Sequence, residues 1–233
     1  MNEIQLSKRL KTAASYVGNN ARLADIGSDH AYLPCYLAQK GLIAFGIAGE
    51  VVLGPFTSAK KQIAASGQEG TVEARLGNGL EVVHLNDRID TLTICGMGGD
   101  LIARILDAGL EEGKLENVKR LILQPNNAEM KLRHWLTDNN FEIITETILE
   151  ENSKIYEIII AEPAKEVSEL TYRDFLFGKF LRSDKNDIFI RKWQSEIQKY
   201  EYILRSLEQT QRDIVEKKTE VLRMIEIIEE EIK

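Results

Sequence analysis

The chain has 233 residues, of which 43% are hydrophobic and 29% are charged, and its formal net charge is −7. That length suits one full domain plus a smaller one, and the composition is typical of a globular protein soluble in water. No apolar run is as long as a membrane span, no signal-peptide core is present, and the acidic balance argues against indiscriminate nucleic-acid binding but allows a local basic surface.

An N-terminal helix is predicted first, from apolar side chains that share one face and a glycine that follows them. These are Ile4, Leu6, Leu10, Ala13, Ala14, Val17 and Gly18. The run 23–26 then predicts a buried strand that Gly27 ends. Pro34 is tolerated only in the first turn of a helix, so the next helix is expected to start close to Asp29, with Ser28 or Asp29 as its cap.

A strand, a glycine turn and a helix in this order open a nucleotide-binding half-domain. Only the first glycine of the dinucleotide fingerprint is present, because Asp29 and His30 stand where further glycines would let a pyrophosphate approach. The carboxylates of Asp25 and Asp29 favour a ligand with a sugar and a cationic or zwitterionic tail. Taken alone, this stretch is explained about as well by an ordinary strand-to-helix turn.

Further strands are predicted in alternation with helices. We place strands at 45–49, 71–76, 89–95 and 120–123, and helices at 55–65, 100–108 and 128–139. The apolar runs 141–149 and 154–161 are too close together for a crossover helix, so they predict an antiparallel hairpin. The predicted fold is α/β, a doubly wound sheet of five parallel strands closed by an antiparallel edge hairpin.

After Pro163 the strands end, and a short helix at 172–181 precedes a heptad-like repeat. The repeat consists of Ile190, Trp193, Ile197, Tyr200, Leu204, Leu207, Gln211, Ile214, Lys218, Val221, Ile225, Ile228 and Ile232. It predicts a small all-α coiled-coil domain, with two antiparallel helices that turn within 208–213. One long helix, which would need a partner chain, is the alternative. The expected domains are 1–162 and 163–233.

Polar residues or glycines follow the parallel strands, at the edge where open α/β sheets bind ligands. Glu50 lies about twenty residues after the first glycine, where a carboxylate accepts both hydroxyls of a ribose. Asn78 suits an adenine edge, although a plain Gly-Asn-Gly turn explains it nearly as well. The run 96–99 offers bare backbone to a planar substrate, or alternatively allows tight packing at a helix start.

The cysteines Cys35 and Cys95 lie within apolar segments, far apart in the sequence. Without an export signal, they are expected to be reduced core thiols of a cytoplasmic protein. A nucleophilic cysteine is the alternative, but no histidine follows at a diagnostic spacing. No group of residues has metal-ligand spacing, so no metal is expected.

Five segments of the sequence closely resemble the bacterial tRNA (adenine-22, N1)-methyltransferases, the TrmK family. They are 25–34, 48–51 with 54–56, 75–80, 96–99 and 123–126. The resemblance covers nearly the whole chain, including 189–193 in the helical tail. It implies a class I (Rossmann-like) methyltransferase fold, S-adenosylmethionine as cofactor, tRNA as partner and a coiled-coil C-terminal domain. The family usually has an aspartate at the position of Asn78, which would accept a hydrogen bond without charge assistance.

The strand ends and the resemblance together give the candidate site residues. The cofactor-binding candidates are Asp25, Gly27, Ser28, His30, Glu50, Val51, Asn78, Gly79, Gly96 and Gly98. The candidates for shaping the adenine slot are Asp29, Tyr32, Met97 and Asn126. N1 of neutral adenine has a lone pair that attacks a sulfonium methyl without a general base, so catalysis is expected from in-line positioning and exclusion of water.

The expected activity is methyl transfer from S-adenosylmethionine to N1 of an adenine in tRNA, with no membrane partner and a monomer or weak homodimer as the working form. Two basic clusters, Lys8 with Arg9 and Lys11, and Arg191 with Lys192, are candidates for phosphate contacts. A small-molecule methyltransferase on the same fold, or a non-catalytic relative that binds RNA or protein, remain the alternatives.

Overall fold

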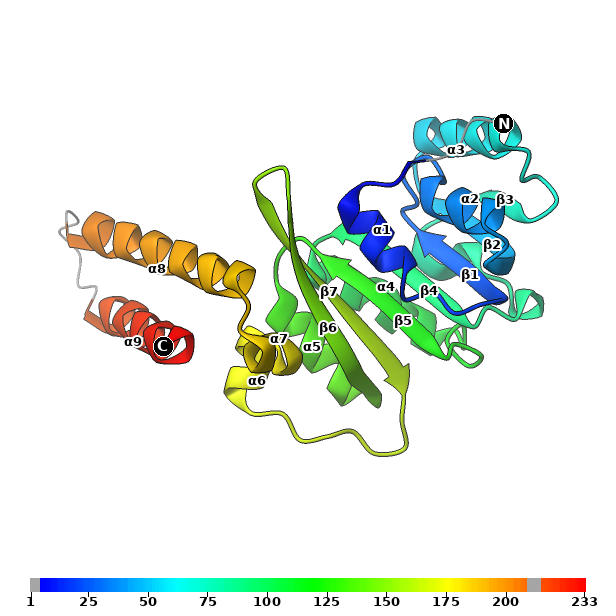
Figure 1. Ribbon diagram of the computed structural model, residues 1–233. Helices are drawn as coiled ribbons and strands as arrows, with labels where there is room; N and C mark the ends of the chain where they lie inside the picture. The colour runs from blue at the N-terminus through cyan, green and yellow to red at the C-terminus, as the bar shows by residue number, and fades with distance from the viewer. Residues whose placement is uncertain (1–4, 209–214) are drawn as a thin grey trace. The chain divides into compact units, whose positions relative to one another are not determined.

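The computed structural model describes residues 5–208 and 215–233 (Figure 1). The chain divides into two compact units, 1–178 and 179–233. The first unit extends beyond the expected boundary at residue 162, because helix α6 (Tyr172–Phe177) packs on helix α5 (Glu129–Asp138). Among the described residues, no helix is both long enough and apolar enough to cross a membrane.

The first unit is built on one mixed sheet, which has seven strands within the described residues. They are β1 (Ala21–Ile26), β2 (Ile43–Glu50), β3 (Val72–Leu76), β4 (Thr91–Met97), β5 (Arg120–Pro125), β6 (Phe141–Glu151) and β7 (Lys154–Pro163). The spatial order is β3-β2-β1-β4-β5-β7-β6. Strands β1 to β5 are parallel, and β7 pairs antiparallel with both β5 and β6. The predicted α/β sheet with its edge hairpin is therefore confirmed.

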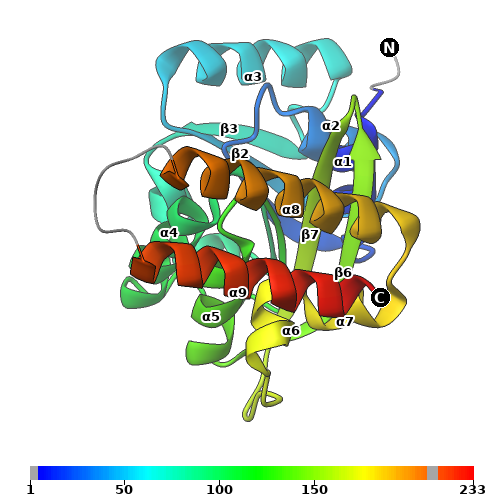
Figure 2. The ribbon, with the colours of Figure 1, turned by 90° about the vertical axis from the view of Figure 1, so that its left-hand side faces the viewer.

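Helices cover both faces of this sheet. They are α1 (Lys8–Ala14), α2 (Tyr32–Gln39), α3 (Leu53–Ser66), α4 (Gly99–Glu111) and α5. Helices α1, α2 and α3 pack one on the next, and α4 packs on α5 (Figures 1 and 2). The central strands are covered on both faces, so the run 121–123 of β5 is fully buried. After β1, the chain adds β2 and β3 on one side of β1, and it then adds β4 and β5 on the other side. In open α/β sheets, the ligand binds at the carboxyl ends of the two strands where the strand order changes side, here β1 and β4.

The turn after β1 differs from its prediction. Helix α2 begins at Tyr32 rather than near Asp29, and neither Ser28 nor Asp29 caps it. The reason is backbone conformation: Asp29, His30 and Ala31 all have left-handed φ values, of 45°, 69° and 59°. Three consecutive residues other than glycine in this conformation are unusual. Because none of the three has right-handed helical φ, the helix cannot begin before Tyr32.

Two predicted helices also differ in extent. Helix α1 starts at Lys8, after the cap Ser7, and the expected apolar residue Ile4 lies outside the described residues. The helix expected at 172–181 is split by Gly178, whose φ is 86°. A Cβ atom at Gly178 would lie 2.7 Å from a guanidinium nitrogen of Arg133, so the close approach requires glycine at this position.

The second unit consists of α7 (Lys179–Asp184), α8 (Asp187–Glu208) and α9 (Val215–Ile232). Helices α8 and α9 lie antiparallel and side by side, as both views show (Figures 1 and 2). This confirms the helical pair over one long helix. The predicted turn, with Gln211 and Ile214 of the repeat, lies outside the described residues, and coiled-coil packing in detail stays a prediction. Within the pair, Val221 and Ile228 are buried.

Candidate active site

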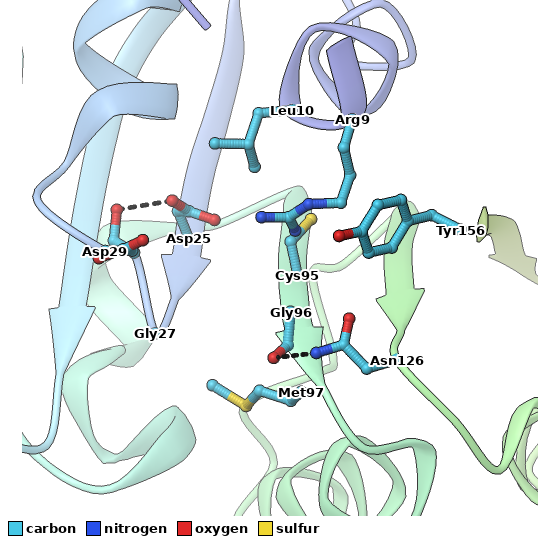
Figure 3. Close-up of a pocket in the computed structure, with 11 residues that line it drawn as sticks. Arg9, Leu10, Asp25, Gly27, Asp29, Cys95, Gly96, Met97, Asn126 and Tyr156 are labelled. Carbon is cyan, nitrogen blue, oxygen red and sulfur yellow. Dashed lines mark hydrogen bonds between the residues drawn. The ribbon is translucent and has the colours of Figure 1, made fainter. Parts of the chain in front are cut away.

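A cavity of about 330 Å³ lies at the carboxyl ends of the central strands (Figure 3). Its lining comes from α1, the turn after β1, the end of β4, the loop after β5, and β7. The lining residues are Arg9, Leu10, Asp25, Gly27, Ser28, Asp29, Cys95, Gly96, Met97, Asn126 and Tyr156. The structure therefore brings half of the predicted site residues together around one space, at the edge that the strand pattern indicated.

The other predicted residues lie outside this lining. They are His30, Tyr32, Glu50, Val51, Asn78, Gly79 and Gly98. His30 and Tyr32 stand side by side after the turn, with ring centroids 5.7 Å apart. Asn78 and Gly79 line a second, smaller cavity against α4. Glu50 ends β2, whose residue Gly49 pairs with Ile26 at the end of β1.

Asp25 is the buried acid of the cavity wall. Its carboxylate accepts hydrogen bonds from the hydroxyl groups of Ser28 and Thr93, both at 2.6 Å. Burial raises the pKa of Asp25 to about 6, and the two hydroxyls and the nearby Arg9 guanidinium oppose that rise. Near neutral pH the side chain is an ionised carboxylate, which can bind a cation that enters the cavity.

Glu50 is also largely buried, with 7% of its surface exposed. Burial raises the pKa of this carboxyl, while a hydrogen bond from the backbone N–H of Asp29 lowers it. Among the described residues, no group donates to Oε1 of Glu50. A buried carboxylate oxygen without a donor is costly, so this atom points to a ligand that supplies hydroxyl or amine hydrogens.

The glycines at the strand ends divide into two groups. Gly27 and Gly96 have φ values of 69° and 81° and face the cavity. A Cβ at Gly27 would lie 2.2 Å from the methyl of Met97. Gly98 and Gly99 instead meet the loop after β5, where a Cβ at Gly99 would lie 2.4 Å from the Ala128 carbonyl. The bare backbone at Gly96 thus borders the cavity, whereas Gly98 and Gly99 allow tight packing.

Arg9 is the main site residue that the sequence did not place in the pocket. Its guanidinium lies 5.5 Å from the ring centre of Tyr156 (Figure 3). Nη1 of Arg9 donates to Oε1 of Gln124 at 2.5 Å. The sequence indicated only a basic surface on the first helix. The missing information is the docking of α1 near the end of the β6–β7 hairpin, which depends on contacts between residues more than 100 positions apart.

Cys95 also lines the cavity, and it is a partly buried residue that packs against the core. Burial raises the pKa of this thiol to about 12, so it stays protonated near neutral pH. A protonated thiol is a poor nucleophile, which agrees with the absence of a catalytic cysteine from the predicted site. Among the described residues, no group of three or more His, Cys, Asp or Glu side chains is arranged to hold a metal ion.

Comparison with known proteins gives a consistent result over the whole chain. A model of the family described as TrmK, tRNA (adenine(22)-N(1))-methyltransferase, matches residues 23–230. The tRNA (adenine(22)-N(1))-methyltransferase of Bacillus subtilis (strain 168) is 45% identical over 215 residues, which cover 90% of this chain and 88% of that protein.

Two solved structures are similar to this chain in three-dimensional fold as well as in sequence. Streptococcus pneumoniae Sp1610 in complex with S-adenosyl-L-methionine is 44% identical, with a TM-score of 0.90 over 98% of this chain and 100% of that one. TrmK of M. capricolum in complex with S-adenosyl-homocysteine is 29% identical, with a TM-score of 0.84 over 97% of each chain. The extent of the family match and the 45% identity show that the chain belongs to the tRNA (adenine(22)-N(1))-methyltransferase family.

Proposed function

We propose that this chain transfers the methyl group of S-adenosylmethionine to N1 of adenine 22 in tRNA, at the cavity formed by the ends of β1, β4 and β5. The observation that carries the proposal is the presence of two opposite charges in the lining of one cavity, the Asp25 carboxylate and the Arg9 guanidinium. The membership in the methyltransferase family and the cofactor complexes of two similar proteins support it.

The amino-acid end of the cofactor carries an ammonium and a carboxylate, which match the two charges of the cavity. Asp25, held by Ser28 and Thr93, would bind the ammonium. Arg9 would bind the carboxylate, because a guanidinium has five N–H donors and the hydrogen bond to Gln124 uses one of them. The backbone at Gly27 and Gly96 adds no side chain that would fill the space between them.

The nucleoside end of the cofactor fits the residues at the carboxyl end of β2 and after β3. The donor-free Oε1 of Glu50 would accept hydrogen bonds from the ribose hydroxyls. Val51, which is 64% exposed, offers an apolar surface beside it for the adenine ring of the cofactor. Asn78 and Gly79 would border the far edge of that ring. His30, close to the Glu50 carboxylate, completes this part of the proposed site.

The cofactor supplies a methyl group on a positively charged sulfur. The chain positions the methyl group and the target base and excludes water from them. N1 of the target adenine carries its own lone pair, so no side chain has to remove a proton before transfer. Asp29, Met97 and Asn126 line the cavity with Gly96, and the exposed Tyr32 follows the same turn as Asp29, at the start of α2. These positions suit the four side chains to hold the target base. The base has to leave any stack or pair to expose N1.

The tRNA itself needs a larger surface than the cavity. We assign this role to Lys8 and Lys11 of α1 and to Arg191 and Lys192 of α8, since phosphate contacts dominate the affinity of proteins for nucleic acids. The α8–α9 pair provides its own antiparallel partner within one chain, which supports a monomer or weak homodimer. A tRNA substrate also supports a cytoplasmic location for the enzyme.

The direct test incubates the protein with labelled S-adenosylmethionine and either bulk tRNA or a metabolite extract, followed by nucleoside analysis. We expect label in 1-methyladenosine from tRNA only. Label in small molecules without label in tRNA would favour a small-molecule methyltransferase. Cofactor binding without any transfer would favour a non-catalytic relative.

A further inference from the structure

Gln124 is a fully buried polar residue at the end of β5, behind the cavity wall. Its side chain makes four hydrogen bonds. Oε1 accepts from Nη1 of Arg9 at 2.5 Å and from the backbone N–H of Gly96 at 3.0 Å. Nε2 donates to the carbonyl of Pro125 at 2.8 Å and to Oδ1 of Asn126 at 3.0 Å. One amide thus joins the cation of the cavity to the loop after β5.

The orientation of the Gln124 amide is fixed by the chemistry of its partners. A guanidinium and a backbone N–H can only donate, so they require the carbonyl oxygen of Gln124. The Pro125 carbonyl can only accept, so it requires the amide nitrogen. The two ends of Gln124 therefore cannot exchange without losing hydrogen bonds in a site with no exposed surface, where lost bonds are costly.

The fixed amide of Gln124 in turn fixes the amide of Asn126. Nε2 of Gln124 requires Oδ1 of Asn126, and Nδ2 of Asn126 then donates to the carbonyl of Gly96 at 2.8 Å (Figure 3). These two bonds use one lone pair of Oδ1 and one hydrogen of Nδ2, so each atom keeps a second position for a ligand. Asn126 is exposed at the cavity while its amide is held from behind.

An asparagine amide that offers one acceptor and one donor matches the N6 and N7 atoms of adenine. On this edge N6 donates and N7 accepts, and binding there leaves N1 free. Guanine presents acceptors at both O6 and N7, so a fixed Oδ1 would face the O6 lone pairs.

We propose that Gln124 is a positioning residue that fixes the amide of Asn126, so that Asn126 reads the N6 and N7 edge of the target adenine and leaves N1 open to the methyl group. This inference rests on the proposed function, because it assumes that adenine 22 of tRNA is the base that enters the cavity. It goes further by assigning the recognition of that base to one amide and the control of that amide to a buried neighbour.

The test combines an atomic change in the tRNA with a change at Gln124. Two tRNAs are assembled by ligation, one with adenosine and one with 7-deazaadenosine at position 22, and kcat/KM is measured for each. For the wild-type chain we expect the 7-deaza tRNA to be about five- to tenfold poorer, as the loss of one hydrogen bond implies. Gln124→Glu keeps acceptors for Arg9 and Gly96 but has no N–H for Asn126.

In Gln124→Glu we expect slower methylation of the adenosine tRNA. The ratio of kcat/KM for the adenosine tRNA to kcat/KM for the 7-deaza tRNA should then be close to one. Asn126→Ala should give the same ratio. Gln68→Glu, which makes the same change after α3 and away from the cavity, should keep the wild-type ratio. A purely structural role for Gln124 would slow both tRNAs equally and leave the wild-type ratio unchanged.

Three outcomes would overturn the inference. The first is that the wild-type chain has nearly equal kcat/KM values for the adenosine tRNA and the 7-deaza tRNA. The second is that Gln124→Glu discriminates between the two tRNAs as strongly as the wild type does. If Gln124→Glu fails to fold, Gln124→Met replaces it, and failure of both would show that Gln124 serves the core alone. A wild-type protein that binds cofactor but methylates neither tRNA would instead contradict the proposed function.

Discussion

Glu151 holds the helix that carries Arg9. Its carboxylate, at the end of β6, accepts hydrogen bonds from the backbone N–H groups of Lys8 and of Arg9 itself, at 2.5 and 3.3 Å. The first turn of α1 is thus capped by a residue from a distant strand, and the guanidinium of Arg9 enters the cavity from that turn. The edge hairpin therefore positions one of the two charges that we assign to the cofactor.

We expect Glu151→Ala to weaken cofactor binding even though Glu151 does not line the cavity. Loss of a helix cap costs about 0.5–2 kcal/mol, and the displaced Arg9 would lose its contact with the cofactor carboxylate. Isothermal calorimetry with S-adenosylmethionine measures the change. Glu111→Ala, at the exposed end of α4, is the matched control and should bind as the wild type does. Equal affinities for the two variants would contradict the positioning of Arg9 by Glu151.

Glu50→Gln should weaken cofactor binding by roughly 1.5–3 kcal/mol without lowering the free energy of unfolding of the free protein. The charge-assisted hydrogen bonds to the ribose are lost, while the cost of a buried carboxylate oxygen without a donor is relieved. Calorimetry and thermal unfolding of the same preparation separate the two effects. Unchanged affinity in a folded variant would remove Glu50 from the site.

The raised pKa of Asp25 predicts opposite effects of pH on stability and on binding. An acid whose folded pKa, about 6, exceeds its ordinary value of 3.8 destabilises the folded state increasingly as pH rises through that interval, by up to about 3 kcal/mol. Binding of an ammonium needs the ionised form, so cofactor affinity should fall as pH drops below about 6.

Asp25→Asn tests the predicted effect of the Asp25 charge on stability and its predicted effect on cofactor binding. The variant should be more stable than the wild type at pH 8, because no buried charge remains, and it should bind the cofactor weakly at every pH. Denaturant unfolding and calorimetry between pH 5 and 8 give the two curves. A wild-type affinity that does not change over this range would contradict the assignment of Asp25 to the ammonium.

Arg133 forms a fully buried ion-pair network with Glu146 and Glu157, at 2.7 and 2.5 Å, and donates to the carbonyl of Phe175. Arg133→Met would leave two buried carboxylates without their cation, so we expect a loss of about 3–5 kcal/mol in unfolding free energy. The triple variant with Glu146→Gln and Glu157→Gln should recover much of this loss. Urea unfolding of the three proteins measures it, and a triple variant as unstable as Arg133→Met would show that charge is not the cause.

Charge reversal in the full chain tests the basic surfaces. Arg191→Glu combined with Lys192→Glu should weaken tRNA binding and flatten its dependence on salt, while cofactor affinity stays unchanged. Lys119→Glu, just before the amino end of β5 and outside the lining of the cavity, is the control. Affinities measured over a salt series give the slopes. Identical slopes for the double variant and the wild type would exclude this part of α8 from tRNA binding.

The sequence predicted those features that depend on local pattern. The alternation of strands and helices predicted the sheet. The position of Asp25, Gly96 and Asn126 at the carboxyl ends of buried strands predicted one side of the cavity. It could not place Arg9, because no local pattern shows that α1 docks beside the end of the hairpin. The capping role predicted for Ser28 was wrong because its hydroxyl donates to Asp25 instead.

The role of Gln124 could not be predicted from the sequence either. Its partners Arg9, Gly96 and Asn126 come from three different elements, and only the fold brings them together. The boundary between the two units also depends on tertiary packing, because the segment after residue 162 has the composition of the tail but contributes α6 to the first unit.

The central claim is that N1 of adenine 22 receives the methyl group, and one substrate tests it directly. A tRNA assembled with 1-deazaadenosine at position 22 keeps the shape of the base and its amino group but has a carbon at the reacting position. Under single-turnover conditions with labelled S-adenosylmethionine, we predict label at position 22 of the adenosine tRNA and none in the 1-deaza tRNA. Equal labelling of the two tRNAs would show that the methyl group goes elsewhere and would contradict the account.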